Sequence, residues 1–321
     1  MQSIKVNFGY FWPDFNKEDN YFTRVLSLKY KVEISDNPDF YFFTHPYNGK
    51  RDYLKYKCHR VFLGWENVRA NWDICDYVLD SDFYENNPRH KRWPIWAAWN
   101  PIRLTAPKEL KHFTAKKKFC CMVVSNGKAK ERIEFFHQLS KYKQVDSGGR
   151  FLNNIGGPVA DKMKFISDYK FVISFENSAS PGYTTEKLIE PMLVNSIPIY
   201  WGNAAVGKDF NTASFINISN SEDYKEAIEK IMELDKDDEK YMAMAAQPWL
   251  NNNQLPREFT QESLAAFFDF VIADSKTKKP VAKNKIKSLK HKMSIFNSRL
   301  ISSLYHRTLR IIKHLKLKLS V

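Results

Sequence analysis

The most informative part of the sequence is residues 175–202, which read FENSASPGYTTEKLIEPMLVNSIPIYWG. A strand-like apolar run leads into this segment, which continues as a polar loop, a helical pattern and a second apolar run at 197–200. Gly182 permits a turn, and Thr184 or Thr185 can cap the helix that follows. The order of strand, helix and strand predicts a parallel sheet covered by helices.

The start of this helix, expected near residues 185–194, suits an anionic ligand. The first backbone N–H groups of a helix have no partner within the helix and carry partial positive charge, so they bind phosphate. Lys187 adds a full positive charge where it opposes the helix dipole, which indicates a functional role. Glu186 fits a structural acid that complements the dipole equally well. Pro191 removes a backbone hydrogen bond and predicts a kink.

The same alternation of strand and helix patterns recurs along the chain. Strand-like apolar runs occur at residues 4–8, 32–34, 40–43, 61–63, 77–79 and 119–124. Helical spacing of apolar residues marks residues 21–28, 133–139, 224–231 and 264–271. Ser219 with Glu222 forms the capping box expected before the third of these helices, and Thr260 is the expected cap of the fourth. The sequence therefore predicts an α/β fold.

The length of 321 residues exceeds what one hydrophobic core usually organises, so two domains are expected. A polar stretch at 105–118, with Pro107 and a cluster of lysines, predicts a linker. We expect an N-terminal domain at residues 1–113, a C-terminal domain at residues 114–274 and a tail at residues 275–321.

The positive charge of the chain is concentrated in this tail. The chain carries 50 Lys and Arg against 36 Asp and Glu, a net charge of +14, yet all 36 acids lie at or before Asp274. Residues 275–321 hold 14 basic residues, and apolar residues recur near one helical face from Ile286 on. This composition is typical of an amphipathic helix that binds an anionic membrane surface. A dimerising helix or a solvated basic tail would also fit, whereas the neutral body argues against nucleic acid.

The rest of the composition is that of a soluble globular protein, with 43% hydrophobic and 27% charged residues. No apolar run approaches the roughly 18–20 residues of a membrane span, and the first residues contain no signal-peptide apolar region. Cys58, Cys75, Cys120 and Cys121 show neither metal-ligand spacing nor a disulfide framework. We therefore expect a cytoplasmic protein in a reducing compartment.

Residues 175–202 resemble the signature of the α1,3/α1,4-fucosyltransferases, the bacterial members in particular. The shared elements are a Phe-Glu-Asn-Ser loop, Gly-Tyr-x-Thr-Glu-Lys, and Ile-Pro-Ile-Tyr-Trp-Gly after a short helix. A weaker likeness extends to residues 64–67, 125–132 and 147–150, and the resemblance covers roughly residues 1–270. It implies the GT-B arrangement, with two Rossmann-like domains facing a cleft, and inverting transfer of L-fucose from GDP-fucose to an acceptor hydroxyl.

The resemblance also implies which residues bind the donor in the C-terminal domain. Lys187 and Arg132 match the cations that contact the diphosphate, and Asn177 and Tyr183 match the polar groups beside them. Glu186 matches the acid that receives the nucleotide ribose hydroxyls. Taken alone, Arg132 also fits a solvated helix face.

Glu66 matches the carboxylate proposed as the general base in bacterial relatives. It follows an apolar run, and the carboxyl end of a parallel strand faces the crevice where ligands bind. Such a base takes the proton of the acceptor hydroxyl while cations or N–H donors stabilise the departing diphosphate. A loop carboxylate that caps a neighbouring turn is the alternative for Glu66.

Asp80-Ser81-Asp82 has the acid-x-acid spacing with which glycosyltransferases of another fold hold a divalent metal. It lies in the N-terminal half, away from the presumed donor domain. Because Lys187 and helix-end N–H groups can neutralise the leaving group, we expect no strict requirement for a metal and none for a cofactor.

Trp93, Trp96 and Trp99 recur every three residues. A pyranose packs its C–H face on an aromatic ring, so these residues fit a sugar-stacking platform for the acceptor. A buried core stripe fits them as well, since large aromatic side chains mostly bury.

These patterns and the resemblance together predict a GDP-fucose-dependent α1,3-fucosyltransferase, peripheral on the inner face of the plasma membrane. Its expected acceptor is the GlcNAc of an N-acetyllactosamine-type glycan containing galactose, as in Lewis-type antigen, lipopolysaccharide or glycoprotein synthesis. Two other interpretations remain: a related enzyme that uses another GDP-sugar, and a membrane-bound adaptor whose α/β body has lost activity.

Overall fold

The structure, a computed structural model, describes residues 1–45, 51–84, 86–284, 291, 293 and 294. The chain forms two compact units. The first contains residues 1–63 and 70–78 and the chain from residue 268 on, and the second contains residues 64–69 and 79–267. The domain boundaries expected from the sequence stay predictions. The amphipathic helix expected from Ile286 on lies mostly outside the described residues.

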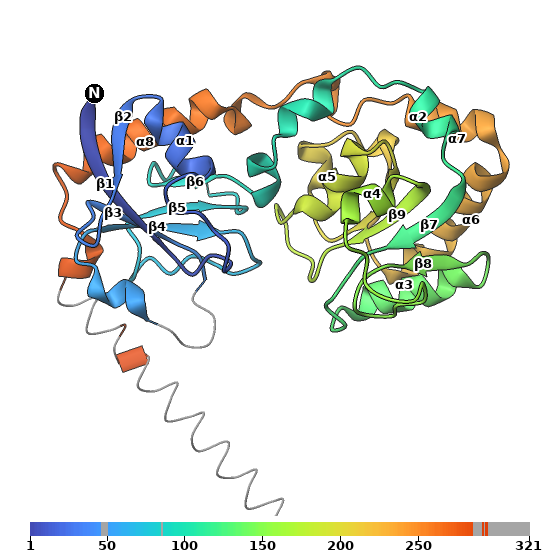
Figure 1. Cartoon of the computed structure of the whole chain (residues 1–321), viewed down its shortest axis with the longest axis horizontal. Helices are drawn as coiled ribbons and strands as arrows, with labels where there is room; N and C mark the ends of the chain where they lie inside the picture. The colour runs from blue at the N-terminus through green and yellow to red at the C-terminus, as the bar shows by residue number, and fades with distance from the viewer. Residues whose placement is uncertain (46–50, 85, 285–290, 292, 295–321) are drawn as a thin grey trace, which may run out of the picture. The chain divides into compact units, whose positions relative to one another are not determined.

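Six strands form one sheet in the order β2-β1-β3-β4-β5-β6 (Figure 1). They are β1 (Gln2–Gly9), β2 (Tyr30–Ile34), β3 (Phe40–Phe43), β4 (His59–Gly64), β5 (Tyr77–Asp80) and β6 (His90–Arg92). β1 is parallel to its neighbours β2 and β3, and β3 is parallel to β4. Every residue of β3 and β4 is buried. This explains why residues 40–43 and 61–63 are continuous apolar runs rather than an alternation of apolar and polar residues.

Two helices contribute aromatic side chains to the core of the first unit. Asn20 caps α1 (Tyr21–Ser27) by accepting the backbone N–H groups of Phe22 and Thr23. The C-terminal part of α8 (Gln261–Ser275) also belongs to this unit, and the ring of Phe268 lies 5.9 Å from that of Phe42 and 6.4 Å from that of Phe22. The core of the first unit therefore combines residues from both ends of the chain.

The second unit is built on a five-stranded sheet in the order β11-β10-β9-β7-β8, in which the neighbouring strands are parallel. Its strands are β7 (Lys118–Met122), β8 (Val145–Ser147), β9 (Tyr169–Phe175), β10 (Ile197–Trp201) and β11 (Ile216–Ile218). Its α-helices are α2 (Lys111–Thr114), α3 (Lys130–Ser140), α4 (Lys162–Ile166), α5 (Glu186–Leu193), α6 (Tyr224–Lys236) and α7 (Asp238–Ala245).

Short 3-10 helices connect these elements in both units. They are η2 (Asp52–Lys55), η3 (Ile95–Ala98), η4 (Pro101–Thr105), η5 (Val206–Lys208), η6 (Thr212–Ser214), η7 (Ser221–Asp223), η8 (Asn251–Asn253), η9 (Arg257–Phe259) and η10 (Val281–Lys283). Within the described part of the chain, no helix is long and apolar enough to cross a membrane.

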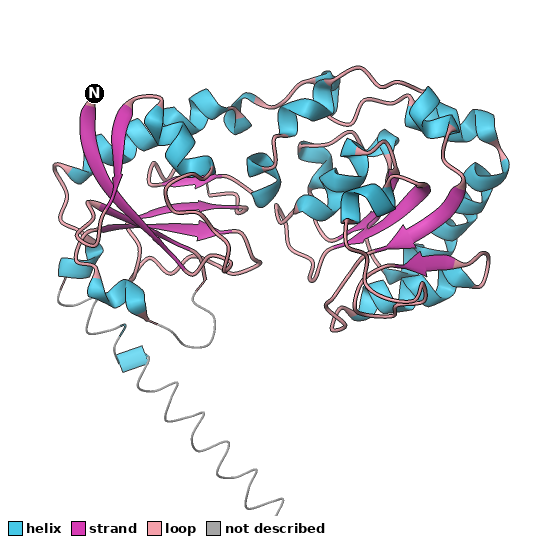
Figure 2. Cartoon of the chain, in the orientation of Figure 1, coloured by secondary structure: helices cyan, strands magenta, loops and turns pink. Residues whose placement is uncertain are grey.

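The expected fold class is confirmed: two parallel sheets are each accompanied by helices, as in Rossmann-like folds (Figure 2). The capping box expected from Ser219 and Glu222 is wrong by one residue, because Asn220 and Asp223 make the two reciprocal hydrogen bonds. Thr260 caps α8 as expected, with its hydroxyl accepting a backbone N–H at 3.3 Å.

The three tryptophans of the N-terminal half have different environments. Trp93 and Trp96 are fully buried, and Trp96 packs against the rings of Phe210 and Phe259 at centroid distances of 4.8 and 4.7 Å. Trp99 remains 36% exposed. The core interpretation is therefore confirmed for Trp93 and Trp96, since a fully buried ring has no face to offer a sugar.

Replacing Trp96 by alanine should lower the free energy of unfolding by about 3–5 kcal/mol, because it leaves a large cavity between two aromatic rings. The matched control Trp99→Ala, at an exposed position three residues away, should cost less than about 1 kcal/mol. Urea unfolding followed by circular dichroism measures both, and equal losses would contradict this assignment of the core.

Candidate functional site

The candidate site forms where β9 and β10 end. These two strands are parallel neighbours, with Phe175 opposite Trp201, and the backbone N–H of Glu176 donates to the Trp201 carbonyl at 2.9 Å. The carboxyl ends of parallel strands meet at one edge of a sheet, which is where α/β proteins bind ligands. The loops that follow β9 and β10 therefore start side by side at the ligand-binding edge of the second unit.

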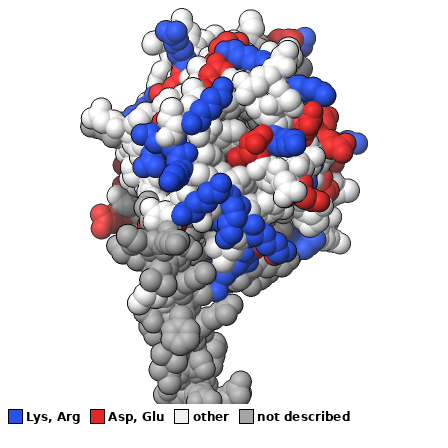
Figure 3. All heavy atoms as spheres, turned by 90° about the vertical axis from the view of Figure 1, so that its left-hand side faces the viewer, with Lys and Arg blue, Asp and Glu red and all other residues white. Residues whose placement is uncertain are grey.

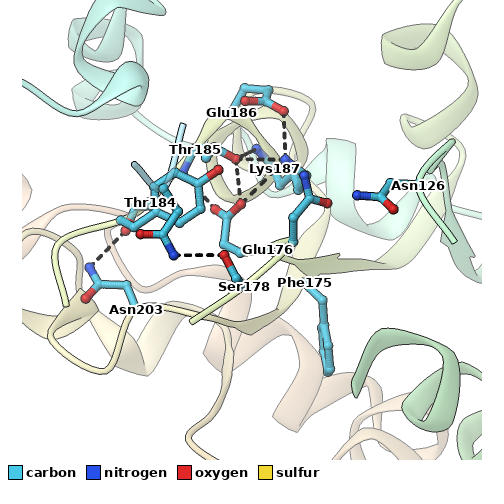
Figure 4. Close-up of polar contacts among 12 residues, drawn as sticks. Asn126, Phe175, Glu176, Ser178, Thr184, Thr185, Glu186, Lys187 and Asn203 are labelled. Atoms are coloured by element: carbon cyan, nitrogen blue, oxygen red, sulfur yellow. Dashed lines mark hydrogen bonds and ion pairs between the residues drawn. The ribbon is translucent and has the colours of Figure 1, made fainter. Parts of the chain in front are cut away.

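Glu176 is the most deeply buried acid of the site, with a side chain that is 0% exposed. One carboxylate oxygen accepts the backbone N–H of Thr185 at 2.7 Å, and the other accepts the Thr185 hydroxyl at 2.8 Å. The ammonium nitrogen of Lys187 lies 3.5 Å from the second oxygen (Figure 4). One buried carboxylate thus holds both the cap and the first-turn lysine of α5.

Gly202 leaves the space that the side chain of Glu176 occupies. Its φ angle is +148°, in the region that favours glycine, and an added Cβ would lie 2.6 Å from the Cγ of Glu176. Any larger residue at position 202, where the signature segment ends, would therefore clash with the buried side chain of Glu176.

A second set of hydrogen bonds fixes the loop between β9 and α5. Asn203 accepts the backbone N–H of Gly182 at 2.8 Å and donates its side-chain amide to the Thr184 hydroxyl at 2.9 Å. Thr184 is fully buried, whereas Thr185 is the helix cap and accepts the Lys187 N–H at 3.3 Å. Of the two threonines considered from the sequence, Thr185 is therefore the N-cap.

The acids and the lysine of this cluster shift one another's pKa values. Burial raises the pKa of Glu176 to about 6, even though Lys187 and Thr185 favour its ionised form. Burial alone would lower the pKa of Lys187, but the neighbouring carboxylates Glu176 and Glu186 raise it. Burial would raise the pKa of Glu186, which Lys187 and Lys162 nevertheless lower. At neutral pH the cluster is ionised, with Lys187 3.2 Å from Glu186.

Arg132 reaches the same strand end from α3. It is 1% exposed, and its Nη2 donates to the Phe175 carbonyl at 2.6 Å and to the Asn177 side chain at 3.0 Å, while its Nη1 donates to the Asn126 carbonyl at 3.3 Å. Burial lowers the pKa of Arg132, and the charge of Glu176 and the phenol of Tyr183 oppose this shift. The solvated-helix-face interpretation of Arg132 is therefore wrong.

The residues expected from the resemblance to bind the donor come together in the second unit. Arg132 contacts Asn177 directly, and Lys187 contacts Glu186 directly. Tyr183 is 3% exposed and lies in the turn that leads to the helix cap, where its N–H donates to the Ser180 carbonyl at 3.1 Å. Lys187 and Glu186 thus lie in the first turn of α5, and Arg132 meets Asn177 at the end of β9, close enough for the charge of Arg132 to act on the pKa of Lys187.

Glu66 lies in the loop after β4, and this loop is tied to the signature segment. The side chain of Asn67 donates to the Ser178 hydroxyl at 2.8 Å, and Arg69 donates to the Ser180 hydroxyl. Glu66 itself is exposed, and among the described residues its carboxylate makes no recorded hydrogen bond or ion pair. This placement argues against the turn-capping alternative and leaves the carboxylate available for a ligand.

The acid-x-acid sequence has partners within the polypeptide. Asp80 lies 2.8 Å from His90 and accepts the backbone N–H of Asp82 at 2.9 Å, and Asp82 forms an ion pair with Arg69. Within the residues that the structure describes, no group of three or more His, Cys, Asp or Glu side chains could hold a metal ion. These acids organise the loop after β5.

Sequence reasoning assigned no role to Glu176, Asn126 or Asn203. Glu176 was visible only as one letter of the signature, and an acid is usually exposed, so its complete burial was not expected. The one available signal was the glycine after β10, which marks a close approach of another group.

Comparisons with known proteins agree with this geometry. The family model described as glycosyltransferase family 10 (fucosyltransferase), C-terminal part, matches residues 113–290. The model of the α-(1,3)-fucosyltransferase FucT N-terminal domain matches residues 6–99. The chain belongs to glycosyltransferase family 10.

Individual members of family 10 resemble the chain over most of its length. The chain is 29% identical over 316 residues to the α-(1,3)-fucosyltransferase FucT of Helicobacter pylori, which covers 84% of this chain and 66% of the relative. A crystal structure of an α1,3-fucosyltransferase matches with a TM-score of 0.75 and 26% identity, over 88% of this chain and 92% of that one.

A crystal structure of α1,3-fucosyltransferase with GDP-fucose matches with a TM-score of 0.71 and 25% identity, over 88% of this chain and 91% of that one. These similarities, together with the two parallel sheets, confirm the expected GT-B fold class of the family 10 chain.

The raised pKa of Glu176 predicts a pH-dependent difference between the wild type and Glu176→Gln. Folded Glu176 holds its proton up to about pH 6, whereas the unfolded side chain releases it near pH 4.5, so ionisation destabilises the fold as pH rises. Glutamine cannot ionise. The free energy of unfolding of Glu176→Gln minus that of the wild type should therefore increase by about 2 kcal/mol between pH 4 and pH 7.

Urea unfolding at a series of pH values measures this difference. The control Glu226→Gln, at an exposed position of α6, should follow the wild type at each pH. A constant difference between Glu176→Gln and wild type across this range would show that Glu176 does not titrate there.

Proposed function

We propose that this chain is an inverting α1,3-fucosyltransferase that moves L-fucose from GDP-fucose to an acceptor hydroxyl. The observation that carries the proposal is the pair of buried cations held beside the end of β9, Arg132 by the Phe175 carbonyl and Lys187 by the carboxylate of Glu176. Family membership and the likeness to a structure solved with GDP-fucose support the same donor. The chain spans 66% of the Helicobacter pylori relative, so the activity of that whole protein is a proposal here.

In the proposed reaction the donor diphosphate binds at the start of α5. The positive end of the α5 dipole and the charges of Lys187 and Arg132 stabilise the negative charge that develops on the leaving GDP. These cations are already held by Glu176 and Asn177, so little reorganisation accompanies the departure of GDP. Glu186 would receive the ribose hydroxyls.

The acceptor side of the reaction requires a base. We assign this role to Glu66, whose exposed carboxylate takes the proton of the acceptor hydroxyl as that oxygen attacks C1 of fucose. The bond between C1 and the phosphate oxygen breaks in the same step, and GDP leaves with the electron pair. A single displacement of this kind inverts the configuration at C1.

The proposed acceptor is the GlcNAc of an N-acetyllactosamine-type glycan, and no metal or cofactor is strictly required. The signature of residues 175–202 and the α-(1,3) designation of the Helicobacter pylori relative support this choice. Incubation of purified protein with GDP-fucose and N-acetyllactosamine, with and without a chelator, tests it directly. Preferred use of GDP-mannose would contradict the donor, and GDP binding without any turnover would favour the inactive adaptor.

Glu66→Gln should lower kcat by roughly 10²- to 10⁴-fold, because the acceptor hydroxyl then loses its proton acceptor. The affinity for GDP should stay unchanged, since Glu66 is not among the residues at the start of α5. Product formation and calorimetric GDP binding measure the two quantities, with Glu109→Gln, at an exposed acid, as the control. Wild-type turnover by Glu66→Gln would show that Glu66 is not the base.

We further propose that the basic tail attaches the enzyme to the inner face of the plasma membrane. Residues 285–321 contain ten Lys and Arg, no acid, and apolar residues at helical spacing. Each basic residue near an anionic surface contributes on the order of 1 kcal/mol, and interspersed apolar side chains add to this attraction.

Deletion of residues 285–321 should reduce binding to vesicles that contain phosphatidylglycerol by roughly tenfold or more. The cut keeps η10, in which Val281 is buried and donates its N–H to Asp76 at 2.6 Å, so the folded body and its activity on soluble acceptors should be preserved. Vesicle co-sedimentation, with pure phosphatidylcholine as the control, measures the change. Unchanged binding would contradict the role of the tail.

A further inference from the structure

A cavity of about 830 Å³ opens in the first unit where its parallel strands begin. It is lined by the starts of β1, β3 and β4, by residues 36–39 before β3 and 55–58 before β4, by Ile272 and Ser275 at the end of α8, and by the segment of residues 276–283 that follows α8. α/β proteins place their catalytic groups at the carboxyl ends of parallel strands, not at the amino ends. This cavity therefore has a role other than the transfer of fucose.

Six lysines line the cavity, and all six are exposed. They are Lys55, Lys57, Lys276, Lys278, Lys279 and Lys283. The acids in the lining are Asp36 and Asp39, and Asp39 already accepts the backbone N–H of Lys5 at 2.9 Å. The first 274 residues are neutral as a whole, and four of the six lysines belong to the basic stretch that follows them.

Most of these lysines have no acidic partner in the protein. Lys55 lies 3.2 Å from Asp52, whereas within the described part of the chain no ion pair is recorded for the other five. Ammonium groups gathered around one cavity repel each other, and an anion that enters between them relieves this repulsion. Figure 3 looks onto this side of the molecule and shows blue Lys and Arg side chains gathered across its surface.

The segment that carries four of the lysines is fixed to the unit rather than free. The carbonyl of Lys278 lies 3.2 Å from the ring nitrogen of His59, and the backbone N–H of Val281 donates to Asp76 at 2.6 Å. The N–H of Lys278 donates to the Asp274 carbonyl at 3.1 Å, which continues the end of α8. The lysines are therefore presented on a folded scaffold.

The sequence that follows residues 276–283 indicates which anion the cavity binds. Residues 285–321 combine ten basic residues with regularly spaced apolar ones, a composition suited to a lipid surface rather than to a soluble anion. Attachment of that sequence to a membrane would bring residues 276–283, which immediately precede it, within reach of the lipid headgroups.

We propose that the lysine-lined cavity of the first unit binds the phosphate-bearing headgroups of anionic phospholipids. The site lies on the folded body and is separate from the donor site, and the proposal rests on the membrane attachment put forward above. It assigns the orientation of the first unit on the membrane to the face on which β1, β3 and β4 begin.

Charge reversal in the full chain tests the cavity. The variant Lys276→Glu/Lys278→Glu/Lys279→Glu should bind vesicles containing phosphatidylglycerol roughly tenfold or more weakly than the control Lys141→Glu/Lys164→Glu/Lys225→Glu. The control makes the same change in net charge at exposed lysines of the second unit. Both variants should keep wild-type GDP affinity, which confirms that they are folded.

The comparison with the tail deletion separates this proposal from the one it rests on. Equal vesicle binding by the two triple variants would overturn the cavity site, even if the tail deletion had its expected effect. If the tail deletion left vesicle binding unchanged while the cavity variant bound more weakly, the cavity site would be supported and membrane attachment through the tail would be contradicted.

Protection of the wild-type lysines against acetylation gives a second measurement that needs no variant. Vesicles containing phosphatidylglycerol should slow acetylation of the six cavity lysines severalfold, and pure phosphatidylcholine should not. Mass spectrometry of peptides reports each site, with Lys141 as the internal control. Equally full protection by inorganic phosphate alone would show a soluble-anion site and contradict the lipid assignment.

Discussion

The carboxylate of Glu176 joins the three segments on which the candidate site depends. Glu176 follows β9, its carboxylate binds the cap of α5 through the backbone and hydroxyl of Thr185, and its Cβ and Cγ fill the space that Gly202 leaves after β10. Removing an ion from water has a penalty of several kcal/mol, which is offset only when the charge finds hydrogen bonds and a counterion. Glu176 has both, since the ammonium of Lys187 lies 3.5 Å away, but they offset only a part of the penalty, because burial still raises the pKa of Glu176.

This constraint explains why a lysine is found in the first turn of α5, where the helix dipole disfavours it. Lys187 is balanced by Glu176 on one side and by Glu186 on the other, so its position is set by partners that belong to the protein. Arg132 is fixed in a similar way by the Phe175 carbonyl and the Asn177 side chain. Both cations are therefore oriented before any ligand arrives, which is the condition for effective electrostatic stabilisation of a leaving group.

The regular elements could be predicted from the sequence because their patterns are local. The buried runs of β3, β9 and β10 and the helical spacing in α6 and α8 needed no knowledge of the rest of the fold. β8 and β11, of three residues each, are too short for any periodicity to be recognised, and they were missed. Secondary structure was therefore predictable where an element is long enough to repeat its pattern.

The candidate site was predictable only in its list of residues, through the likeness of residues 175–202 to a known signature. The burial of Glu176 and of Arg132 depends on contacts between segments far apart in the chain, such as the hydrogen bond from Arg132 to the Phe175 carbonyl. Charged residues are exposed in most proteins, and a solvated helix face was one of the two interpretations open for Arg132. The sequence alone therefore did not indicate that either side chain would be buried.

The return of α8 to the first unit has a consequence for how the protein is made. Phe268 packs against Phe22 and Phe42, so the core of the first unit lacks a part of its wall until residue 268 has left the ribosome. The second unit consists of residues 64–69 and 79–267, so all of its residues have been synthesised by then. During translation the unit that begins first is thus finished last, and its aromatic core stays open to chaperones in the meantime.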